Sequence, residues 1–175
     1  MRLPSPQLCG SAIRVQFRPE LTNWRGKLLS NEDRGQPVHA SCFLTKRQIV
    51  LESALLENWP ELSRILVHEV FHFSWVRLGN PLRSSYHELL RAEMKAGARG
   101  ELGWSAEWRK EKLTDSDVQG NSRRWREYAV ESFCDTAAYI YSDCTSHAEF
   151  TLRNHWRVRR IQWYAGIFRA RPVFI

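Results

Sequence analysis

A pair of histidines inside one apolar segment constrains this chain more than any other feature. His68 and His72 are four residues apart with Glu69 beside the first, in the pattern His-Glu-x-x-His. On an α-helix, residues i and i+4 lie on the same face one turn apart, so two imidazoles at this spacing can bind the same zinc ion. The glutamate then lies where it can take a proton from a water molecule at that site.

The residues around the motif predict a helix that begins near Pro60 and ends before Gly79. Pro60 and Glu61 are typical of a first helical turn, and Gly79 followed by Pro81 is typical of a stop. Between them, apolar residues recur at helical spacing, at Leu62, Ile65, Leu66, Val70, Phe73 and Val76. We therefore expect the motif to lie mid-helix in apolar surroundings, where charged side chains need partners. The alternative is two surface histidines beside a solvated glutamate.

A catalytic zinc site needs a third protein ligand and one open position. No histidine occurs within the six residues after His72, which excludes the extended pattern with a third histidine on the same segment. Glu131 is the best candidate, because it lies in a second helical segment with Asp135 one turn further on. One of these carboxylates can bind zinc while the other accepts the outer N–H of a liganding histidine. The other candidates for the third ligand are Glu93, His87, Asp135, Cys134 and His147.

The first motif, followed by Glu-x-x-x-Asp on a later helix, resembles the signature of the gluzincin zinc metallopeptidases, and in length the chain resembles the small minigluzincins. The resemblance covers only these two helices. It implies that His68, His72 and Glu131 bind Zn2+. It also implies that Glu69 is the general base and that Asp135 hydrogen-bonds a ligand histidine.

The resemblance further implies a zincin-like α+β fold, in which a small N-terminal sheet packs on a helical majority. Alternating apolar residues predict strands at 12–18, 38–44 and 48–51, which would form a small mixed or antiparallel sheet. In the family, the edge strand of such a sheet pairs with an extended peptide, because an open edge offers unpaired N–H and C=O groups. We expect residues 1–175 to form a single domain, since this length suffices for one core.

Local signals divide the rest of the chain into helices and loops. Residues 85–98 begin with a capping-box pattern, and 105–113 form a short helix capped by its first serine. An acidic loop is expected at 114–120, and the helix with the second motif at about 122–141. A last helix is expected at about 149–169.

The predicted reaction is Zn2+-dependent hydrolysis of a peptide or protein substrate, with Glu69 as general base. It passes through an oxyanion that a second donor stabilises, and family members use a tyrosine or histidine for this. The candidates here are Tyr128, one turn before Glu131 on its helix, and His147, just after the same helix.

The spacer between the motifs is longer than in many proteins with this pattern, so about 80–120 is an insertion. It is rich in tryptophan. Trp104, Trp108 and Trp125 are candidates to wall a cleft, although core packing is the commoner role of such residues. His39 has no motif support and is expected on the surface or in the core.

The formal net charge of +7 is concentrated at the C-terminus, where the segment from Thr151 to Ile175 contains six arginines and no acidic residue. We expect the basic helix at 149–169 to pack an apolar stripe on the domain and to expose a solvated basic face. The same face is a candidate for weak, salt-sensitive binding to nucleic acid or to an anionic membrane. A non-catalytic zinc-binding or nucleic-acid-associated module is therefore the alternative function.

Two absences in the sequence predict the compartment. No stretch approaches the roughly 20 apolar residues of a transmembrane helix, and the first residues lack the apolar core of a signal peptide. The four cysteines form no C-x-x-C pair and are scattered, which favours reduced thiols over a disulfide framework. These features predict a cytoplasmic protein.

Overall fold

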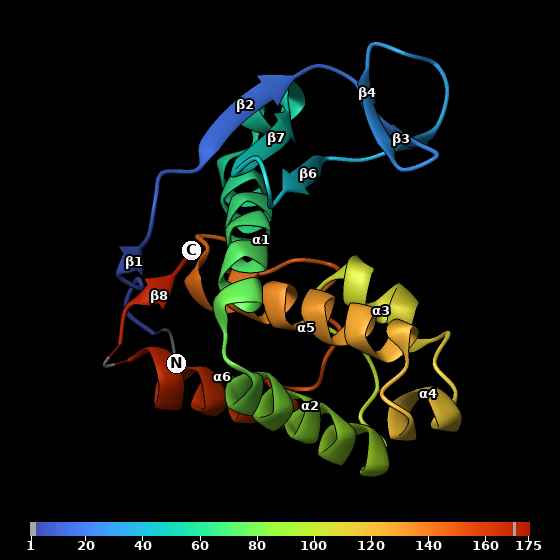
Figure 1. The fold of residues 1–175 in the computed structure, drawn as a ribbon, viewed down its shortest axis with the longest axis vertical. Helices are drawn as coiled ribbons and strands as arrows, with labels where there is room; N and C mark the ends of the chain where they lie inside the picture. Colours follow the sequence, from blue (N-terminus) through green and yellow to red (C-terminus); the bar gives the residue numbers. More distant parts are fainter. Residues whose placement is uncertain (1–2, 170) are drawn as a thin grey trace.

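The computed structural model describes residues 3–169 and 171–175 and has an α+β fold (Figure 1). Its α-helices are α1 (Trp59–Arg77), α2 (Asn80–Lys95), α3 (Trp104–Lys110), α4 (Asp115–Gln119), α5 (Arg123–Tyr141) and α6 (Asn154–Phe168). Its strands are β1 (Leu8–Cys9), β2 (Arg14–Arg18), β3 (Leu21–Trp24), β4 (Lys27–Ser30), β5 (Gln36–Pro37), β6 (Ala40–Phe43), β7 (Gln48–Glu52) and β8 (Val173–Phe174). Within the described ranges, no helix combines the length and the apolar character needed to span a lipid bilayer.

A three-stranded sheet in the order β2-β7-β6 covers one end of α1 (Figure 1). β2 pairs with β7 in parallel and β6 pairs with β7 antiparallel, so the sheet is mixed. The strands predicted from alternation are present with slightly different bounds. β6 is an edge strand, and its outer edge has no strand partner in the part of the chain that the structure describes.

The middle strand holds this sheet on α1. Ile49 and Leu51 of β7 are fully buried, because alternate residues of a strand point to the same face. They pack against Leu62, Ile65 and Phe73, which lie on one side of α1. The other sides of α1 therefore remain available for α5 and for the polar motif.

A second small sheet, β4-β3-β5, lies on the same side of α1 as α3 (Figure 1). Its hairpin turns at Arg25 and Gly26, whose φ angles are 50° and 77°. Two left-handed residues at a two-residue turn match the twist of antiparallel strands, which explains the tight connection between β3 and β4.

The helical core forms where α1, α2, α5 and α6 meet. Phe71 of α1 and Phe133 of α5 are buried against Tyr164 of α6, and the rings of Phe133 and Tyr164 stack with their centroids 5.2 Å apart. The Tyr164 hydroxyl donates to the Phe133 carbonyl at 2.5 Å. α5 is thus fixed between α1 and α6, which orients Glu131 and Asp135 toward α1.

The start of α2 differs from the prediction. The helix begins at Asn80 with Pro81 in its first turn, so the capping box predicted at Ser85 is wrong. Proline is preorganised for the first helical turn and needs no N–H partner there. Ser85 lies inside the helix, where its hydroxyl donates to the Leu82 carbonyl at 2.9 Å.

Two further predictions in the insertion are wrong. The short helix α3 begins at Trp104 with Gly103 as its N-cap, so Ser105 is inside the helix and does not cap it. The segment predicted as an acidic loop contains α4. Its capping box pairs Thr114 with Asp117, a pattern that uses the acidic side chain as a cap and so favours a helix.

The last helix is shorter than the predicted 149–169, because it begins only at Asn154. The backbone N–H groups of Thr151 and Leu152 donate to the Glu101 carbonyl at 2.9 Å, which holds the preceding residues out of the helix. The expected solvated face is also interrupted, since Arg160 is fully buried and pairs with Glu93 and Glu101.

Candidate metal centre

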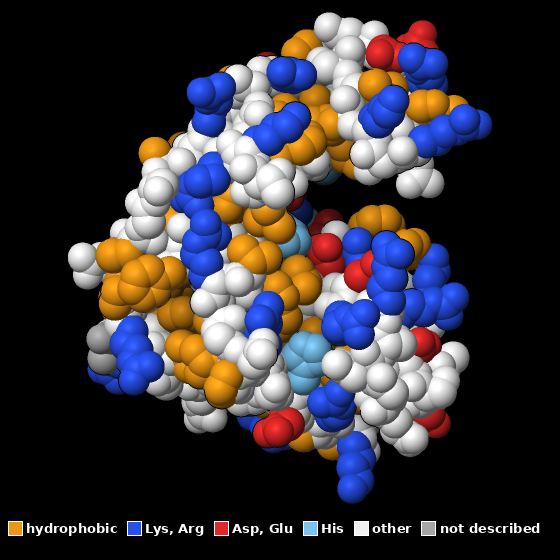
Figure 2. All heavy atoms as spheres, viewed as in Figure 1, with side chains coloured by type: hydrophobic (Ala, Val, Ile, Leu, Met, Phe, Trp, Pro, Cys, Tyr) orange, Lys and Arg blue, Asp and Glu red, His pale blue; other side chains and the backbone are white. Residues whose placement is uncertain are grey.

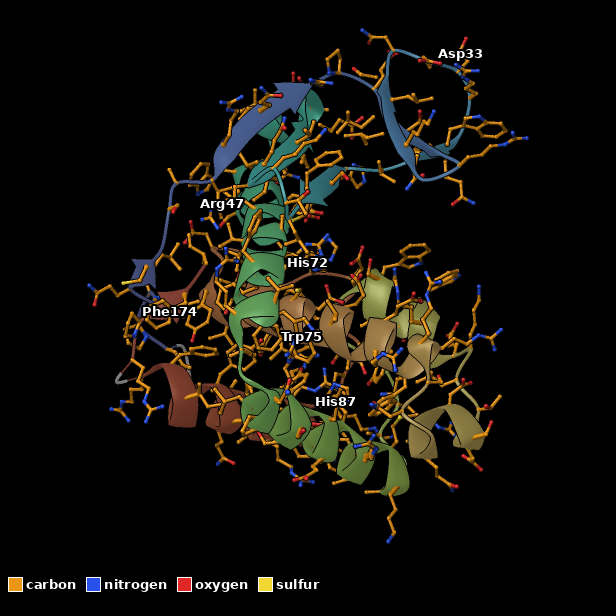
Figure 3. All side chains as sticks on the ribbon, viewed as in Figure 1. Asp33, Arg47, His72, Trp75, His87 and Phe174 are labelled. Carbon is orange, nitrogen blue, oxygen red and sulfur yellow. The ribbon has the colours of Figure 1, made fainter. Side chains whose placement is uncertain are left out.

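The two motif histidines point their ring nitrogens at one another from successive turns of α1. His68 Nε2 and His72 Nε2 lie 3.2 Å apart. Two nitrogens bound to the same tetrahedral zinc at ordinary bond lengths lie roughly 3.3 Å apart. Figure 3 shows His72 projecting from α1 on the side where α3 lies. The spacing of the two nitrogens therefore suits a shared metal ion.

Two carboxylates from α5 face the same histidine. Glu131 Oε2 lies 3.4 Å from His68 Nε2. On the other side of the ring, His68 Nδ1 donates to Asp135 Oδ1 at 2.7 Å. Burial lowers the pKa of His68, but the Asp135 and Glu131 carboxylates raise it well above its usual value, so the metal-free ring is charged. Once Nε2 gives up its proton to a metal ion, its lone pair faces His72 and Glu131 while the Nδ1 proton stays on the hydrogen bond to Asp135.

Burial and mutual charge shift the ionisation of these groups. Burial, together with the charges of Glu131 and Asp135, raises the pKa of Glu69 to about 7 against the opposing charge of His68. Burial and the neighbouring His68 lower the pKa of His72 to about 4. Burial opposes ionisation of Glu131, but the hydrogen bond and charge of His68 lower its pKa to about 2. The group nearest neutrality is therefore Glu69, as expected of a general base.

The motif lies at the bottom of a groove between β6 and α3. One hollow of about 390 Å³ extends from Glu69 toward Pro37 and Ala40. A second hollow of about 260 Å³ extends from Glu69 toward His72 and Leu44. The two share His68, Glu69 and Ser105, so they form one continuous groove. Figure 2 shows a deep indentation at this level of the molecule.

The outer wall of the groove contains residues that sequence reasoning placed elsewhere or left open. Trp104 lines the groove and is 61% exposed, and its ring lies 6.0 Å from that of Trp108. His39 also lines it, with Nδ1 donating to Glu52 Oε2 at 2.8 Å. Trp125 is fully buried in the core. Of the three tryptophans considered from sequence, Trp104 is thus the one that lines the groove.

Tyr128 does not face this groove. It is fully buried, and its hydroxyl donates to Glu101 Oε1 at 2.6 Å. Three residues correspond to about 300° of helical rotation, so Tyr128 is displaced by roughly 60° around α5 from Glu131. That displacement directs the ring into the core and corrects its assignment as an oxyanion donor.

His147 is near the groove without lining it. Its Nε2 lies 3.4 Å from Glu61 Oε2, and its Nδ1 accepts the Glu149 N–H at 3.3 Å. Arg64 occupies the intervening position, because its guanidinium pairs with Glu61 and Glu149 and lines the first hollow. Apart from the motif histidines and the indole of Trp104, Arg64 and His39 are the cationic or N–H-bearing side chains that line the first hollow.

The alternative third ligands differ in where they lie. Glu93 pairs with the buried Arg160, and His87 accepts the indole N–H of Trp125 at 2.7 Å, both away from the motif. Cys134 is different, because its sulfur and the nitrogens of the two motif histidines all lie within 4.8 Å of one another. Cys134 follows Glu131 by three residues, so it is rotated around α5 in the opposite sense to Tyr128, and its buried side chain lies on the side of α1.

Gly103 is a further residue that sequence reasoning missed. A Cβ at this position would lie 2.3 Å from Asp135 Cγ and 2.4 Å from each carboxylate oxygen. The missing side chain lets the start of α3 approach Asp135, and the Ala106 N–H donates to Asp135 Oδ2 at 3.2 Å. Asp135 is therefore held between α1 and α3.

If the two histidines hold zinc as predicted from the sequence, replacing Gly103 with alanine is expected to weaken its binding about 10- to 100-fold, the usual effect of losing an outer partner of a ligand histidine. The new Cβ displaces the Asp135 carboxylate, which frees the His68 ring. Zinc affinity can be measured by competition with a chromogenic chelator. The matched control is Gly166→Ala, because a Cβ at Gly166 meets nothing within 4 Å. Equal zinc affinity in the two variants would contradict this role of Gly103.

No protein-family model, curated protein or solved structure matches this chain. The groove geometry and its donor set are therefore the basis for a functional conclusion. The relevant features are two facing imidazoles, a nearby carboxylate, a buried glutamate and an open strand edge.

Proposed function

We propose that the chain is a zinc-dependent peptidase of the zincin-like, gluzincin type. The observation that carries this proposal is the distance from His68 Nε2 to two other donor atoms. His68 Nε2 lies 3.2 Å from His72 Nε2 and 3.4 Å from Glu131 Oε2. Ligand atoms on one tetrahedral zinc are separated by roughly 3.3–3.4 Å.

The chemistry of the donors suits zinc. Two neutral imidazoles and one carboxylate are a common set for catalytic zinc, which keeps a further position open. The three residues would hold the ion, while Asp135 fixes the orientation and tautomer of His68. A zinc ion held there would act as a Lewis acid toward water and toward a substrate carbonyl.

Glu69 is the proton carrier in this proposal. Its side chain is buried in the groove beside the ligands, and burial raises its pKa to about 7. A carboxylate with this pKa accepts a proton from the attacking water and can return it to the departing nitrogen at neutral pH. His39 and Arg64 line the groove and are the candidates to donate to the oxyanion.

The edge strand supports a peptide as the substrate. Ser41, Cys42 and Leu44, at and just after β6, line the groove next to Glu69. The outer edge of β6 offers backbone N–H and C=O groups along the groove, and an extended peptide satisfies such groups by adding a strand. Trp104 provides an apolar wall on the opposite side.

A zinc measurement on Glu131→Ala tests the ligand set. We expect one zinc per chain in the parent and an affinity at least about 100-fold weaker in the variant. Removing a ligand should weaken zinc binding more than removing a residue that only hydrogen-bonds a ligand. Glu127→Ala is the matched control, since Glu127 is on the same helix and pairs with Arg123 at the surface. No zinc in the parent after metal is added back would refute the proposal.

One observation favours a second function, a closed and non-catalytic metal site. The sulfur of Cys134 is close enough to the two histidine nitrogens to be considered a ligand. If zinc affinity falls in Cys134→Ala as well as in Glu131→Ala, four protein ligands would fill the coordination sphere and leave no open position. Unchanged affinity in Cys134→Ala would favour the peptidase.

A further inference from the structure

A hollow distinct from the two that form the groove lies on the other side of α5 from the candidate metal centre. It has a volume of about 450 Å³ and lies between α2 and the start of α5. Its lining includes Arg83 and Arg91 of α2, Arg126 of α5 and the buried His87. In Figure 3, His87 lies below Trp75 between α2 and α5, whereas His72 lies above α5.

The three arginines of this hollow lack acidic partners. Among the described residues, none of them forms an ion pair, whereas the buried Arg64 and Arg160 each pair with two glutamates. Their hydrogen bonds go to uncharged oxygens. Arg83 Nη2 donates to Asn80 Oδ1 at 2.7 Å, Arg91 Nε to the Val118 carbonyl at 3.1 Å, and Arg126 Nη1 to the Asn121 carbonyl at 2.8 Å. Each guanidinium therefore keeps N–H groups for another acceptor.

Two of these arginines lie near the N-terminal ends of helices, where a positive charge is unfavourable. The first turns of α2 and α5 contain no acidic residue, and Arg83 and Arg126 lie near these helix starts. The N-terminal end of a helix carries partial positive charge, so a cation there is unfavourable and an anion is favourable. Glu88 is the one acidic side chain lining the hollow, and it does not neutralise three arginines. The arrangement has an excess of positive charge inside a concave surface.

His87 contributes a buried, uncharged ring to the wall of this hollow. It is 8% exposed, and its Nδ1 accepts the Trp125 indole N–H at 2.7 Å, so the neutral ring carries its proton on Nε2. Burial and the charges of Arg91, Arg83 and Arg126 lower the pKa of His87 to about 4. The ring is also stacked on Trp75, with centroids 5.9 Å apart.

We propose that this hollow binds a phosphate group, in inorganic phosphate or in a small phosphomonoester, at a site separate from the metal centre. A phosphate dianion offers several strong acceptor oxygens, which can receive hydrogen bonds from guanidinium groups on three sides at once. A carboxylate has only two oxygens and one charge. The volume is in the range of small-molecule sites and leaves room for an organic group beside the phosphate.

Calorimetric titration of the zinc-loaded protein with inorganic phosphate and with glycerol 3-phosphate tests the site. We expect one saturable site, weakened about tenfold or more in Arg126→Gln, because a charge-assisted hydrogen bond is lost. The matched control is Arg124→Gln, which removes the same charge from the same turn of α5 but lines a different hollow. We expect it to bind like the parent. Tighter binding of the ester assigns the site to phosphomonoesters, and equal binding assigns it to the free ion.

Three outcomes would overturn the proposal. The first is no saturable binding of either anion at millimolar concentration. The second is equal weakening in Arg124→Gln and Arg126→Gln, which would indicate diffuse attraction to a basic surface such as a nucleic acid uses. The third is unchanged binding in Arg126→Gln, which would put the anion elsewhere, including on the zinc. Thermal unfolding without anion checks folding, and Arg83→Gln replaces Arg126→Gln if the latter does not fold.

Discussion

Glu69→Gln is expected to lower the proposed peptide hydrolysis by a factor of roughly 10²–10⁴, while the proposed zinc ion stays bound. Glutamine has nearly the same shape but cannot accept a proton from water at neutral pH. Among the described residues, the hydrogen bonds and ion pairs of His68 and His72 involve one another, Glu131 and Asp135 and not Glu69, so the ligand set should be unaffected. The measurement pairs zinc content with the cleavage rate of a quenched peptide library.

Glu57→Gln is the control for this substitution, because Glu57 is exposed just before α1 and outside the groove. It should cleave like the parent. If Glu69→Gln keeps both zinc and activity, the general base lies elsewhere and the proposed mechanism is wrong. If the variant loses zinc, Glu69 has a role in holding the ligands that the geometry does not indicate.

Local patterns were enough to predict the elements that carry the candidate site. The helix around His68 follows from apolar residues at helical spacing with Pro60 near its start, and α1 has these features. The helix around Glu131 follows from the same kind of spacing, and Ser122 caps α5 as expected for its start. The three strands of the sheet on α1 follow from alternation, which left open whether the sheet is mixed or antiparallel. In each case the residues that predict the helix or strand lie within that helix or strand.

Sequence reasoning named Trp104 as one of three candidates for the wall of the groove. It could neither choose among them nor find Gly103, because these residues meet the motif only in three dimensions. Trp104 and Gly103 belong to the insertion, yet they lie against Asp135 and opposite β6. No spacing along the chain relates these positions. Tyr128 illustrates the same limit, since a one-turn offset from Glu131 was a reasonable guess for a shared face, but the angular difference places its ring in the core.

The prediction of a solvated basic face was wrong at Arg160, which is buried. The run of arginines near the C-terminus predicts a solvated basic face, and most residues of such a run are indeed exposed. Arg160 instead faces the interior of the helical bundle. Because α6 packs across α2 and α5, the residue meets Glu93 and Glu101 from elements far away in sequence. The acidic residues that balance it cannot be found from its own helix.

Arg160→Met is expected to lower the free energy of unfolding by at least about 3–5 kcal/mol, because it leaves two buried carboxylates without their cation. Arg160 Nη2 lies 2.7 Å from Glu93 Oε2 and Nη1 lies 2.6 Å from Glu101 Oε2, and all three side chains are essentially fully buried. Lys110 also pairs with Glu101, at 3.0 Å, but it does not replace the lost contacts to Glu93. Urea unfolding at neutral pH measures the difference. Arg159→Met, a neighbouring surface position, should change stability little.

The pH dependence distinguishes this network from simple packing by a long side chain. Burial opposes ionisation of Glu101, but the charge and hydrogen bonds of Arg160 lower its pKa to about 2, against an unfolded value near 4.5. The resulting stabilisation is present above pH 4.5 and is lost as the pH falls toward 2. Without Arg160, the buried carboxyls should prefer to be protonated, so acidification should destabilise the variant less than the parent. Parallel loss of stability with pH in both proteins would mean that Arg160 acts through its volume and not through its charge.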